Sequence, residues 1–256
     1  MKYIGIIPAR YASTRFPGKP LAMLGDKTVI QRVYEQAAKV LDSVAVAPDD
    51  ERIAAAVRAF GGTAVMTSTE HRSGTDRVRE AYKNLGSDAD VIINIQGDEP
   101  FIATSQIRAL MGCFEDPEVQ IATLARRYDP NGGFDGLFDP NLVKVVFGDD
   151  GRALYFSRSI IPYVRGVDWK EWLDKATFYS HVGVYAYRAA TLDHIGTLPQ
   201  SSLEKAESLE QLRWLQNGLT IKVAVTDAPT IGIDTPQDLE AARKYLETLS
   251  ADGHER

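Results

Sequence analysis

The stretch that decides the fold is YIGIIPARYASTRFPGKPL, residues 3–21. Its first part, residues 3–7, is a short apolar run typical of a buried parallel strand. The part that follows, residues 8–21, places Arg10, Arg15 and Lys19 among small and turn-forming residues. Ligands of open α/β sheets bind beyond the carboxyl ends of the strands. The sequence therefore predicts a cationic loop at a ligand-binding edge.

A loop of this composition suits a polyanion, because guanidinium and ammonium groups neutralise phosphate oxygens while backbone N–H groups donate to them. The alternative is a surface loop whose cations are simply solvated. The spacing matches neither the G-x-x-x-x-G-K-[ST] phosphate loop nor the G-x-G-x-x-G dinucleotide fingerprint. We therefore expect a phosphate site that belongs to neither an ordinary kinase nor a dehydrogenase.

The composition is that of a soluble globular protein with one large domain, or one domain and a subdomain. Of the 256 residues, 44% are hydrophobic and 25% charged, and the formal net charge is −6. An acidic chain is a poor candidate for binding nucleic acid through a general positive field. The sequence shows no bilayer-spanning run and no secretion signal, and its single cysteine, Cys113, excludes an intramolecular disulfide. We expect a cytoplasmic protein that binds neither nucleic acid nor membrane.

Strand and helix patterns alternate through the first half of the chain. Strand patterns occupy residues 44–47, 63–66, 91–95 and 120–125, and helical apolar spacing separates them. Asp49 is expected to cap the helix that follows the first of these strands. The alternation predicts an α/β fold, with a mostly parallel sheet and helices on both of its faces.

Two more polar loops follow predicted strands. In residues 73–77, Ser73 is either a helix cap or a nucleotide contact, and Gly74 permits close backbone approach. Residues 96–100 follow the most apolar run and carry Asp98, which either caps a turn or binds Mg²⁺. We favour the metal, because the phosphate-sized cationic loop is expected at the same edge of the sheet.

The middle third departs from this pattern. Residues 142–156 predict an antiparallel hairpin around a turn at 148–151, and residues 178–188 predict a further strand. We therefore expect an insertion over approximately residues 129–190, with a sheet of its own. Its polar residues Arg158, His181 and Tyr185 either reach the strand-end cleft or are structural.

The C-terminal part predicts two helices and a strand. Leucines between residues 203 and 215 indicate one helix that ends at residues 217–218, and residues 220–225 read as a strand. Thr235, Pro236 and Asp238 predict a well-capped last helix. Asp234 lies just outside that helix and needs another explanation.

Several motifs, in order along the whole chain, resemble those of the 3-deoxy-manno-octulosonate cytidylyltransferases, or CMP-Kdo synthetases. They are residues 8–21, SGTDR at 73–77, QGDEP at 96–100, LYFSR at 154–158, HVGVY at 181–185, LEQLR at 209–213 and DTP at 234–236. The resemblance implies a three-layer, Rossmann-like nucleotidyltransferase fold, a smaller inserted antiparallel dimerisation region and a homodimer. The chain departs from the family pattern at residues 71–72 and in a longer loop at 131–136, which leaves the dimer contacts open.

The resemblance also implies an activity. CMP would pass from CTP to the anomeric hydroxyl of 3-deoxy-D-manno-octulosonate (Kdo), with release of pyrophosphate, for lipopolysaccharide assembly in a Gram-negative cell. It assigns Mg²⁺ to Asp98 and Asp234, and catalysis to these two carboxylates with Arg10 and Lys19. The residues expected to contact the nucleotide are Pro8, Ala9, Arg10, Arg15, Lys19, Arg72, Ser73 and Gly74. Those expected to contact the sugar are Gln96, Arg158, His181, Tyr185, Glu210 and Gln211.

Two alternatives remain open on sequence alone. The acceptor could be another acidic sugar, such as a sialic acid or an amino-substituted Kdo. The chain could also be a binding subunit that keeps the fold without the chemistry. Such a subunit should lack a phosphate-binding cation or a metal-binding acid, whereas Arg10, Lys19, Asp98 and Asp234 are all present.

Overall fold

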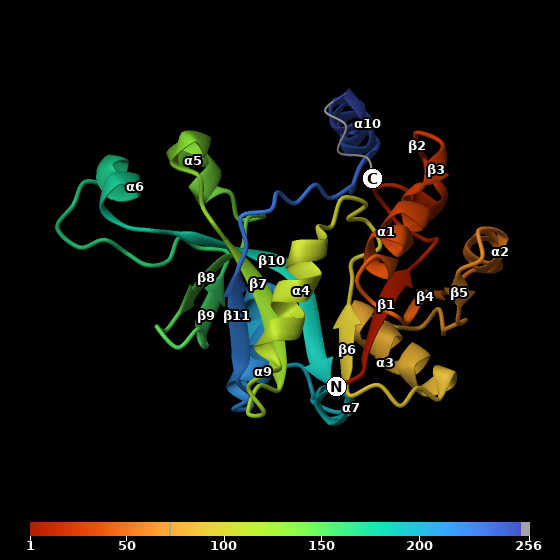
Figure 1. The fold of residues 1–256 in the computed structure, drawn as a ribbon. Coiled ribbons are helices and arrows are strands. Elements are labelled where there is room, and N and C mark those ends of the chain that lie inside the picture. The colour runs from red at the N-terminus through yellow and green to blue at the C-terminus, as the bar shows by residue number, and fades with distance from the viewer. Residues whose placement is uncertain (72, 252–256) are drawn as a thin grey trace. The chain divides into compact units, whose positions relative to one another are not determined.

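The computed structural model describes residues 1–71 and 73–251, and these form two compact units (Figure 1). The first unit comprises residues 1–107 together with the segment from residue 229 onward, and the second comprises residues 108–228. Helix α4 (Thr104–Cys113) begins in the first unit and ends in the second. Each unit has its own arrangement of strands and is described separately.

The first unit contains four parallel strands in the order β6-β1-β4-β5. They are β1 (Tyr3–Ala9), β4 (Val44–Pro48), β5 (Thr63–Ala64) and β6 (Val91–Asn94). The side chains of β4 and β6 are buried along their whole length, as expected for strands covered on both faces. The expected parallel α/β arrangement is confirmed, although β5 is shorter than its sequence pattern.

Helices α1 (Val29–Ala38), α2 (Glu51–Ala59) and α3 (Gly74–Leu85) connect these strands. The chain moves outward from β1 to β4 and β5, then returns to β6 on the other side of β1. Right-handed crossovers therefore place α1 and α2 on one face of the sheet and α3 on the other. Because the direction reverses between β1 and β6, a crevice is expected at the carboxyl ends of these two strands.

Short elements complete the first unit. A 3-10 turn, η1 (Lys19–Leu21), leads into the hairpin of β2 (Met23–Leu24) and β3 (Lys27–Thr28). Helix α10 (Pro236–Ala251) packs its apolar side against this region, where Leu239, Ala242 and Leu246 join Leu24 and Val29 in one cluster. None of the described helices is long and apolar enough to cross a membrane.

The predicted cap of α2 was wrong by one residue. The carboxylate of Asp50, not that of Asp49, accepts a hydrogen bond from the backbone N–H of Arg52 in the first turn. The Asp49 Oδ1 atom instead accepts from the backbone N–H of Tyr11, at 2.9 Å. Either of two adjacent acids satisfies a capping pattern, and only the tertiary partner decides between them.

The second unit contains five strands: β7 (Ile121–Arg127), β8 (Lys144–Phe147), β9 (Ala153–Ser157), β10 (Tyr179–Arg188) and β11 (Ile221–Val225). Strand β7 pairs in parallel with β11 and antiparallel with β10, and β8 pairs antiparallel with both β9 and β10. The predicted hairpin is present, but it extends this sheet and does not form a sheet of its own. The compact unit is also wider than the predicted insertion, residues 129–190.

The helices of the second unit are short. They are α5 (Gly133–Phe138) after the turn η2 (Pro130–Gly132), α6 (Trp172–Lys175) after η3 (Trp169–Glu171), α7 (Ala189–Ile195), α8 (Ser202–Glu207) and α9 (Gln211–Gln216).

The single helix predicted between residues 203 and 215 is therefore two helices. The break falls at Ser208, which adopts a left-handed conformation with φ of 52°. Nε and Nη2 of Arg158 donate to the backbone carbonyls of Glu207, at 2.6 Å, and Ser208, at 3.4 Å. These bonds satisfy carbonyls at the break, so a contact distant in sequence stabilises a conformation that serine rarely adopts.

Candidate active site

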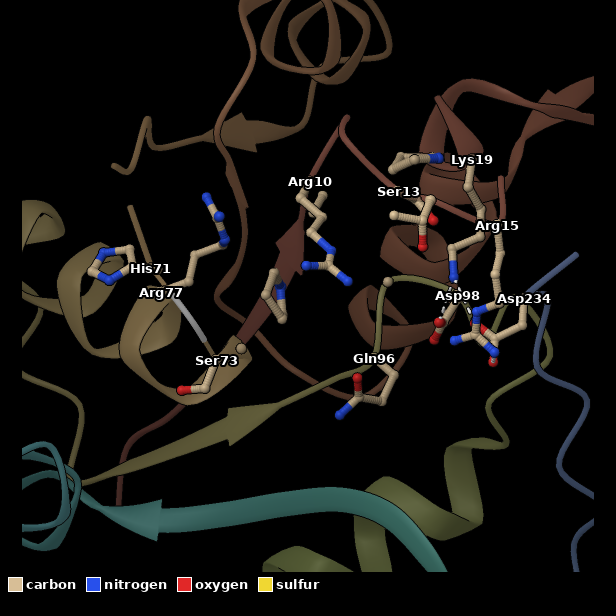
Figure 2. Close-up of a pocket in the computed structure, with 16 residues that line it drawn as sticks. Arg10, Ser13, Arg15, Lys19, His71, Ser73, Arg77, Gln96, Asp98 and Asp234 are labelled. Atoms are coloured by element: carbon tan, nitrogen blue, oxygen red, sulfur yellow. Dashed lines mark hydrogen bonds and ion pairs between the residues drawn. The ribbon is translucent and has the colours of Figure 1, made fainter. Parts of the chain in front are cut away.

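A pocket of about 330 Å³ lies in the first unit, at the carboxyl ends of β1 and β6 (Figure 2). Its walls come from the loop after β1, the start of α3, the loop after β6 and the segment before α10. The lining residues are Pro8, Ala9, Arg10, Ser13, Thr14, Arg15, Lys19, Pro20, His71, Ser73, Gly74, Arg77, Gln96, Gly97, Asp98 and Asp234. The pocket therefore lies at the crevice that the strand order predicts.

The floor of the pocket depends on a close approach between the ends of two strands. A Cβ atom at position 97 would lie 2.6 Å from the backbone oxygen of Pro8, which is closer than a side-chain carbon can come. Glycine is therefore required at this position. The absence of a side chain here lets the loop that carries Gln96 and Asp98 lie directly against the start of the cationic loop.

The cationic loop after β1 folds back on itself. The backbone N–H of Gly18 donates to the carbonyl of Tyr11 at 2.9 Å, and Gly18 has a φ of 70°, which suits glycine. Lys19 follows immediately in η1. Figure 2 shows Arg10 between two groups of side chains: Arg15 and Lys19 with the carboxylates on one side, and the residues of α3 on the other. The three predicted cations thus line one pocket.

Asp98 and Asp234 converge on the ammonium group of Lys19. Nζ lies 2.7 Å from Oδ2 of Asp98 and 3.2 Å from Oδ1 of Asp234, and Nη1 of Arg15 lies 3.3 Å from the other oxygen of Asp234. A backbone hydrogen bond of 2.9 Å from Ile233 to the carbonyl of Asp98 joins the two segments. Two carboxylates this close would repel each other, and the intervening ammonium compensates for that repulsion.

A buried ion pair ties α3 to the cationic loop. Nη2 of Arg77 lies 3.1 Å from Oδ2 of Asp49, and both side chains are less than a tenth exposed. Nη1 of Arg77 donates to Thr67 at 2.7 Å, while Asp49 accepts from the backbone N–H of Tyr11. Burial lowers the pKa of Arg77, and Asp49 acts against that shift. The pair therefore fixes the distance between the helix start and the phosphate-binding loop.

The start of α3 confirms Ser73 as a helix cap, and its contact with a nucleotide stays a prediction. Its Oγ accepts from the backbone N–H of Asp76 at 3.1 Å, so Ser73 is the helix cap, and the residue also lines the pocket. Within the loop after β6, burial raises the pKa of Glu99 to about 7, and the neighbouring charge of Asp98 adds to the rise. Asp98 is thus flanked by a carboxyl group that is partly neutral near neutral pH.

Comparison with known proteins places this geometry in a family. Residues 4–221 match the family described as Cytidylyltransferase. The chain is 62% identical over 246 residues to the 3-deoxy-manno-octulosonate cytidylyltransferase of Phocaeicola vulgatus, which covers 96% of this chain and 98% of the relative. It is 61% identical over 250 residues to that of Bacteroides thetaiotaomicron, covering 98% and 100%. The chain belongs to the 3-deoxy-manno-octulosonate cytidylyltransferase family.

A solved structure supports the same assignment of fold. The structure of CMP:2-keto-3-deoxy-manno-octonic acid synthetase complexed with CTP is 43% identical to this chain, with a TM-score of 0.89, and the match covers 97% of this chain and 99% of that one. The Rossmann-like nucleotidyltransferase fold expected from the sequence is therefore confirmed, with a mostly parallel central sheet.

For a cytidylyltransferase of this family, most of the predicted nucleotide-contacting residues line the one pocket. Pro8, Ala9, Arg10, Arg15, Lys19, Ser73 and Gly74 all do so, and Arg72 lies outside the described residues. Gln96, predicted to contact the sugar, lines the same pocket. Sequence reasoning did not single out Ser13, Thr14, His71 or Arg77 as site residues. For Arg77 a signal was present, since it lies one helical turn after Ser73 and so on the same side of α3.

The donor set at Asp98 and Asp234 fits a magnesium ion. Mg²⁺ takes oxygen ligands and is typically held by one or two carboxylates together with substrate phosphates. Here two carboxylates already face one cationic group beside a cationic pocket. Among the described residues, no group of three or more His, Cys, Asp and Glu side chains could hold a metal ion. A metal at this position would therefore depend on oxygens of the bound nucleotide.

The other residues predicted to contact the sugar belong to the second unit. His181 and Tyr185 are neighbours on β10, with ring centroids 5.3 Å apart. Glu210 accepts from Arg213 at 2.7 Å, and Gln211 is buried in α9. Arg158 donates to backbone carbonyls around the break between α8 and α9. Their contact with a sugar stays a prediction.

Proposed function

We propose that this protein transfers CMP from CTP to Kdo, giving CMP-Kdo and pyrophosphate, and thereby activates Kdo for lipopolysaccharide assembly. The main support is the pocket at the ends of β1 and β6, where three cations and two carboxylates meet. The chain that forms this pocket is 62% identical to the 3-deoxy-manno-octulosonate cytidylyltransferase of Phocaeicola vulgatus. Cations suit a triphosphate, and carboxylates suit the metal ion that accompanies it.

In this function the residues of the pocket act mainly by position and charge. Arg10, Arg15 and Lys19 bind the triphosphate and offset the charge that develops on the departing pyrophosphate. The start of α3 offers its cap Ser73 and the close backbone approach at Gly74 to the nucleoside part. The sugar hydroxyl attacks the α-phosphorus in line with the departing oxygen, and binding both anions in this geometry supplies much of the rate enhancement.

Mg²⁺ is the proposed cofactor, held by Asp98 and Asp234. When bound, it would lower the pKa of a coordinated hydroxyl and neutralise phosphate charge. The chain's own contribution is to hold the two carboxylates at one point, through the bond from Ile233 to Asp98 and the ammonium of Lys19. We also propose a cytoplasmic location, which the use of a single cysteine supports.

A pyrophosphate-release assay with CTP and Mg²⁺ tests the activity. We expect release with Kdo and little release with N-acetylneuraminate. A third reaction with 8-amino-Kdo shows whether the enzyme distinguishes Kdo from this close analogue. The Asp98→Asn variant, folded by circular dichroism, should lose most of the release. Equal turnover of Kdo and N-acetylneuraminate, or turnover of the sialic acid alone, would refute the proposed acceptor. Release that is unchanged in Asp98→Asn would refute the assigned site.

The proposed assembly is a homodimer formed through an aromatic groove of the second unit. The groove is lined by Phe134, Phe138, Tyr163, Trp169 and Trp172, and its volume is about 500 Å³. Phe138 is 56% exposed, Tyr163 75% and Trp169 48%. Clustered exposed aromatic side chains are typical of protein–protein interfaces. The groove also lies within residues 129–190, where the resemblance predicts the dimerisation region.

Sedimentation of matched variants tests this assembly. Trp169→Glu places a charge in the groove and should shift the chain towards monomer at concentrations where the wild type is dimeric. Val225→Glu, at a residue of β11 that is 48% exposed and lies outside both the groove and residues 129–190, is the control and should remain dimeric. A monomeric wild type, or equal dissociation of both variants, would contradict an interface at this groove.

A further inference from the structure

His181, Tyr185 and Thr123 lie on one face of the second unit's sheet, beside an irregularity in β10. His181 pairs with Ala125 of β7 and Val182 with Leu124, but the next paired residue is Tyr185, opposite Thr123. Gly183 and Val184 are thus extra residues in β10. Since Ala125 and Thr123 are two positions apart on β7, their partners His181 and Tyr185 share a face of the sheet. Two extra residues keep the alternation of faces, so the effect of the irregularity is to bring Tyr185 opposite Thr123, where regular pairing would place Gly183.

The hydroxyl group of Thr123 is at the centre of this cluster. Thr123 is fully buried, and its Oγ1 lies 2.9 Å from Nε2 of His181, 2.9 Å from the carbonyl oxygen of Val184 and 3.3 Å from that of Val182. A threonine hydroxyl has one proton to donate and can accept through its lone pairs, whereas a carbonyl can only accept. One assignment of the protons forms two hydrogen bonds, whereas a hydroxyl that donated to Nε2 of His181 would donate to neither carbonyl. The hydroxyl donates to a carbonyl, and Nε2–H of His181 donates to the hydroxyl.

The ring of His181 is neutral in this environment. Burial lowers its pKa to about 3, and its ring neighbours are Phe156, at 5.0 Å between centroids, and Tyr185. A neutral imidazole carries a single proton. If that proton is on Nε2, the other nitrogen, Nδ1, has a lone pair and can act only as an acceptor.

We propose that Thr123 is a positioning residue that holds His181 in the Nε2–H tautomer and so makes Nδ1 an acceptor for a hydroxyl of the acceptor sugar. This rests on the proposed function and on the predicted contact of His181 with the sugar. A lone pair at this position binds an O–H donor and repels a carboxylate, which can only accept. His181 therefore selects a hydroxyl group and leaves the sugar's carboxylate to the cationic groups of the protein.

The first test is spectroscopic and does not depend on activity. Long-range ¹H–¹⁵N correlation spectra distinguish the two neutral tautomers and the protonated ring, and a His181→Gln variant identifies the signal among the four histidines of the chain. We expect the Nε2–H pattern in the wild type and in Thr123→Ser, which keeps the hydroxyl. Thr123→Val keeps the shape and suits a strand, but should give a mixture of tautomers. Thr191→Val, at another buried threonine of the same unit, should not change the signal. An Nδ1–H or protonated wild type, or an unchanged signal in Thr123→Val, would overturn the proposal.

The second test measures whether the tautomer of His181 affects the KM for the sugar. In Thr123→Val, the KM for the sugar should rise about fivefold, the scale of one neutral hydrogen bond, while the KM for CTP stays the same and Thr123→Ser restores the wild-type value. A changed tautomer with an unchanged sugar KM would overturn the role of Nδ1. Failure of the proposed function would look different, because the wild type would then release no pyrophosphate with Kdo while the tautomer of His181 remained as expected.

Discussion

Replacing Lys19 with methionine should weaken catalysis but strengthen magnesium binding when no nucleotide is present. In the structure, the ammonium of Lys19 contacts both carboxylates assigned to the metal, at 2.7 and 3.2 Å. It therefore competes with a metal ion for the same oxygens. Methionine keeps the length and apolar stem of the side chain and removes its charge, so the two carboxylates are left without their common partner.

The size of the effect follows from the charges. Two oxygens in contact with one ammonium are at most about 6 Å apart, and two unit charges at that distance repel by roughly 3 kcal/mol at an effective dielectric constant of about 20 and by less than about 1 kcal/mol in bulk water. The side chain of Asp98 is 30% exposed and that of Asp234 is 49% exposed, so the lower part of this range applies. Relief of about 1 kcal/mol of repulsion by a bound cation corresponds to roughly a fivefold gain in affinity for Mg²⁺.

Thermal unfolding in increasing Mg²⁺, without nucleotide, measures this gain. The unfolding temperature of Lys19→Met should rise at about fivefold lower Mg²⁺ than that of the wild type, and Lys19→Met combined with Asp234→Asn should lose the gain. With CTP and Kdo, Lys19→Met should turn over about a hundredfold more slowly, the scale of one preorganised electrostatic contact. The reasoning would be refuted by equal Mg²⁺ midpoints in Lys19→Met and wild type, or by an unchanged gain after the second substitution.

Two further predictions concern stability. Asp49→Asn should lower the free energy of unfolding by about 3 kcal/mol in urea titrations, because Arg77 would keep a buried charge without its partner, whereas Asp50→Asn, at the neighbouring helix cap, should cost little because asparagine also caps helices. Similar losses in the two variants would argue against the ion pair. The pKa of His181 is lowered to about 3, so between pH 3 and its ordinary value of 6.5 the unfolded chain binds a proton that the folded chain does not. Stability should therefore fall as the pH drops through this window, His181→Gln should reduce that slope, and identical slopes would contradict a neutral buried ring.

Much of the first unit could be predicted from the sequence because its signals are local. The apolar runs of β1, β4 and β6 are short, bounded by turn residues and buried as their composition requires. Ser73 was expected as a possible cap, and the structure confirms that it caps α3. Polar residues directly after two such strands meet at one edge of a parallel sheet, which explains why Arg10 and Asp98 were found together.

The features that the sequence did not reveal depend on distant partners. No residue near Ser208 marks a break in the helix, because the carbonyls at the break accept hydrogen bonds from Arg158, which directly follows β9. Asp50 and not Asp49 caps the helix, because the carboxylate of Asp49 forms an ion pair with Arg77. The two extra residues in β10 are visible only through its pairing with β7. In each case, local propensity permits two outcomes and a tertiary contact selects one of them.

Lys19 has two expected partners, the carboxylates of Asp98 and Asp234 in the free protein and the phosphates of a bound nucleotide. Without nucleotide, the side chain of Lys19 is only 15% exposed, and its ammonium group compensates for two converging carboxylates that would otherwise repel each other. In the proposed function, a nucleotide bound with a divalent cation would supply that compensation and would also bring phosphate oxygens into the same pocket. We therefore expect Lys19 to turn from the carboxylates to the phosphates as the nucleotide binds, with little net change in the number of ion pairs. One ammonium group can thus compensate for two carboxylates in the free protein and bind phosphate oxygens in the proposed complex.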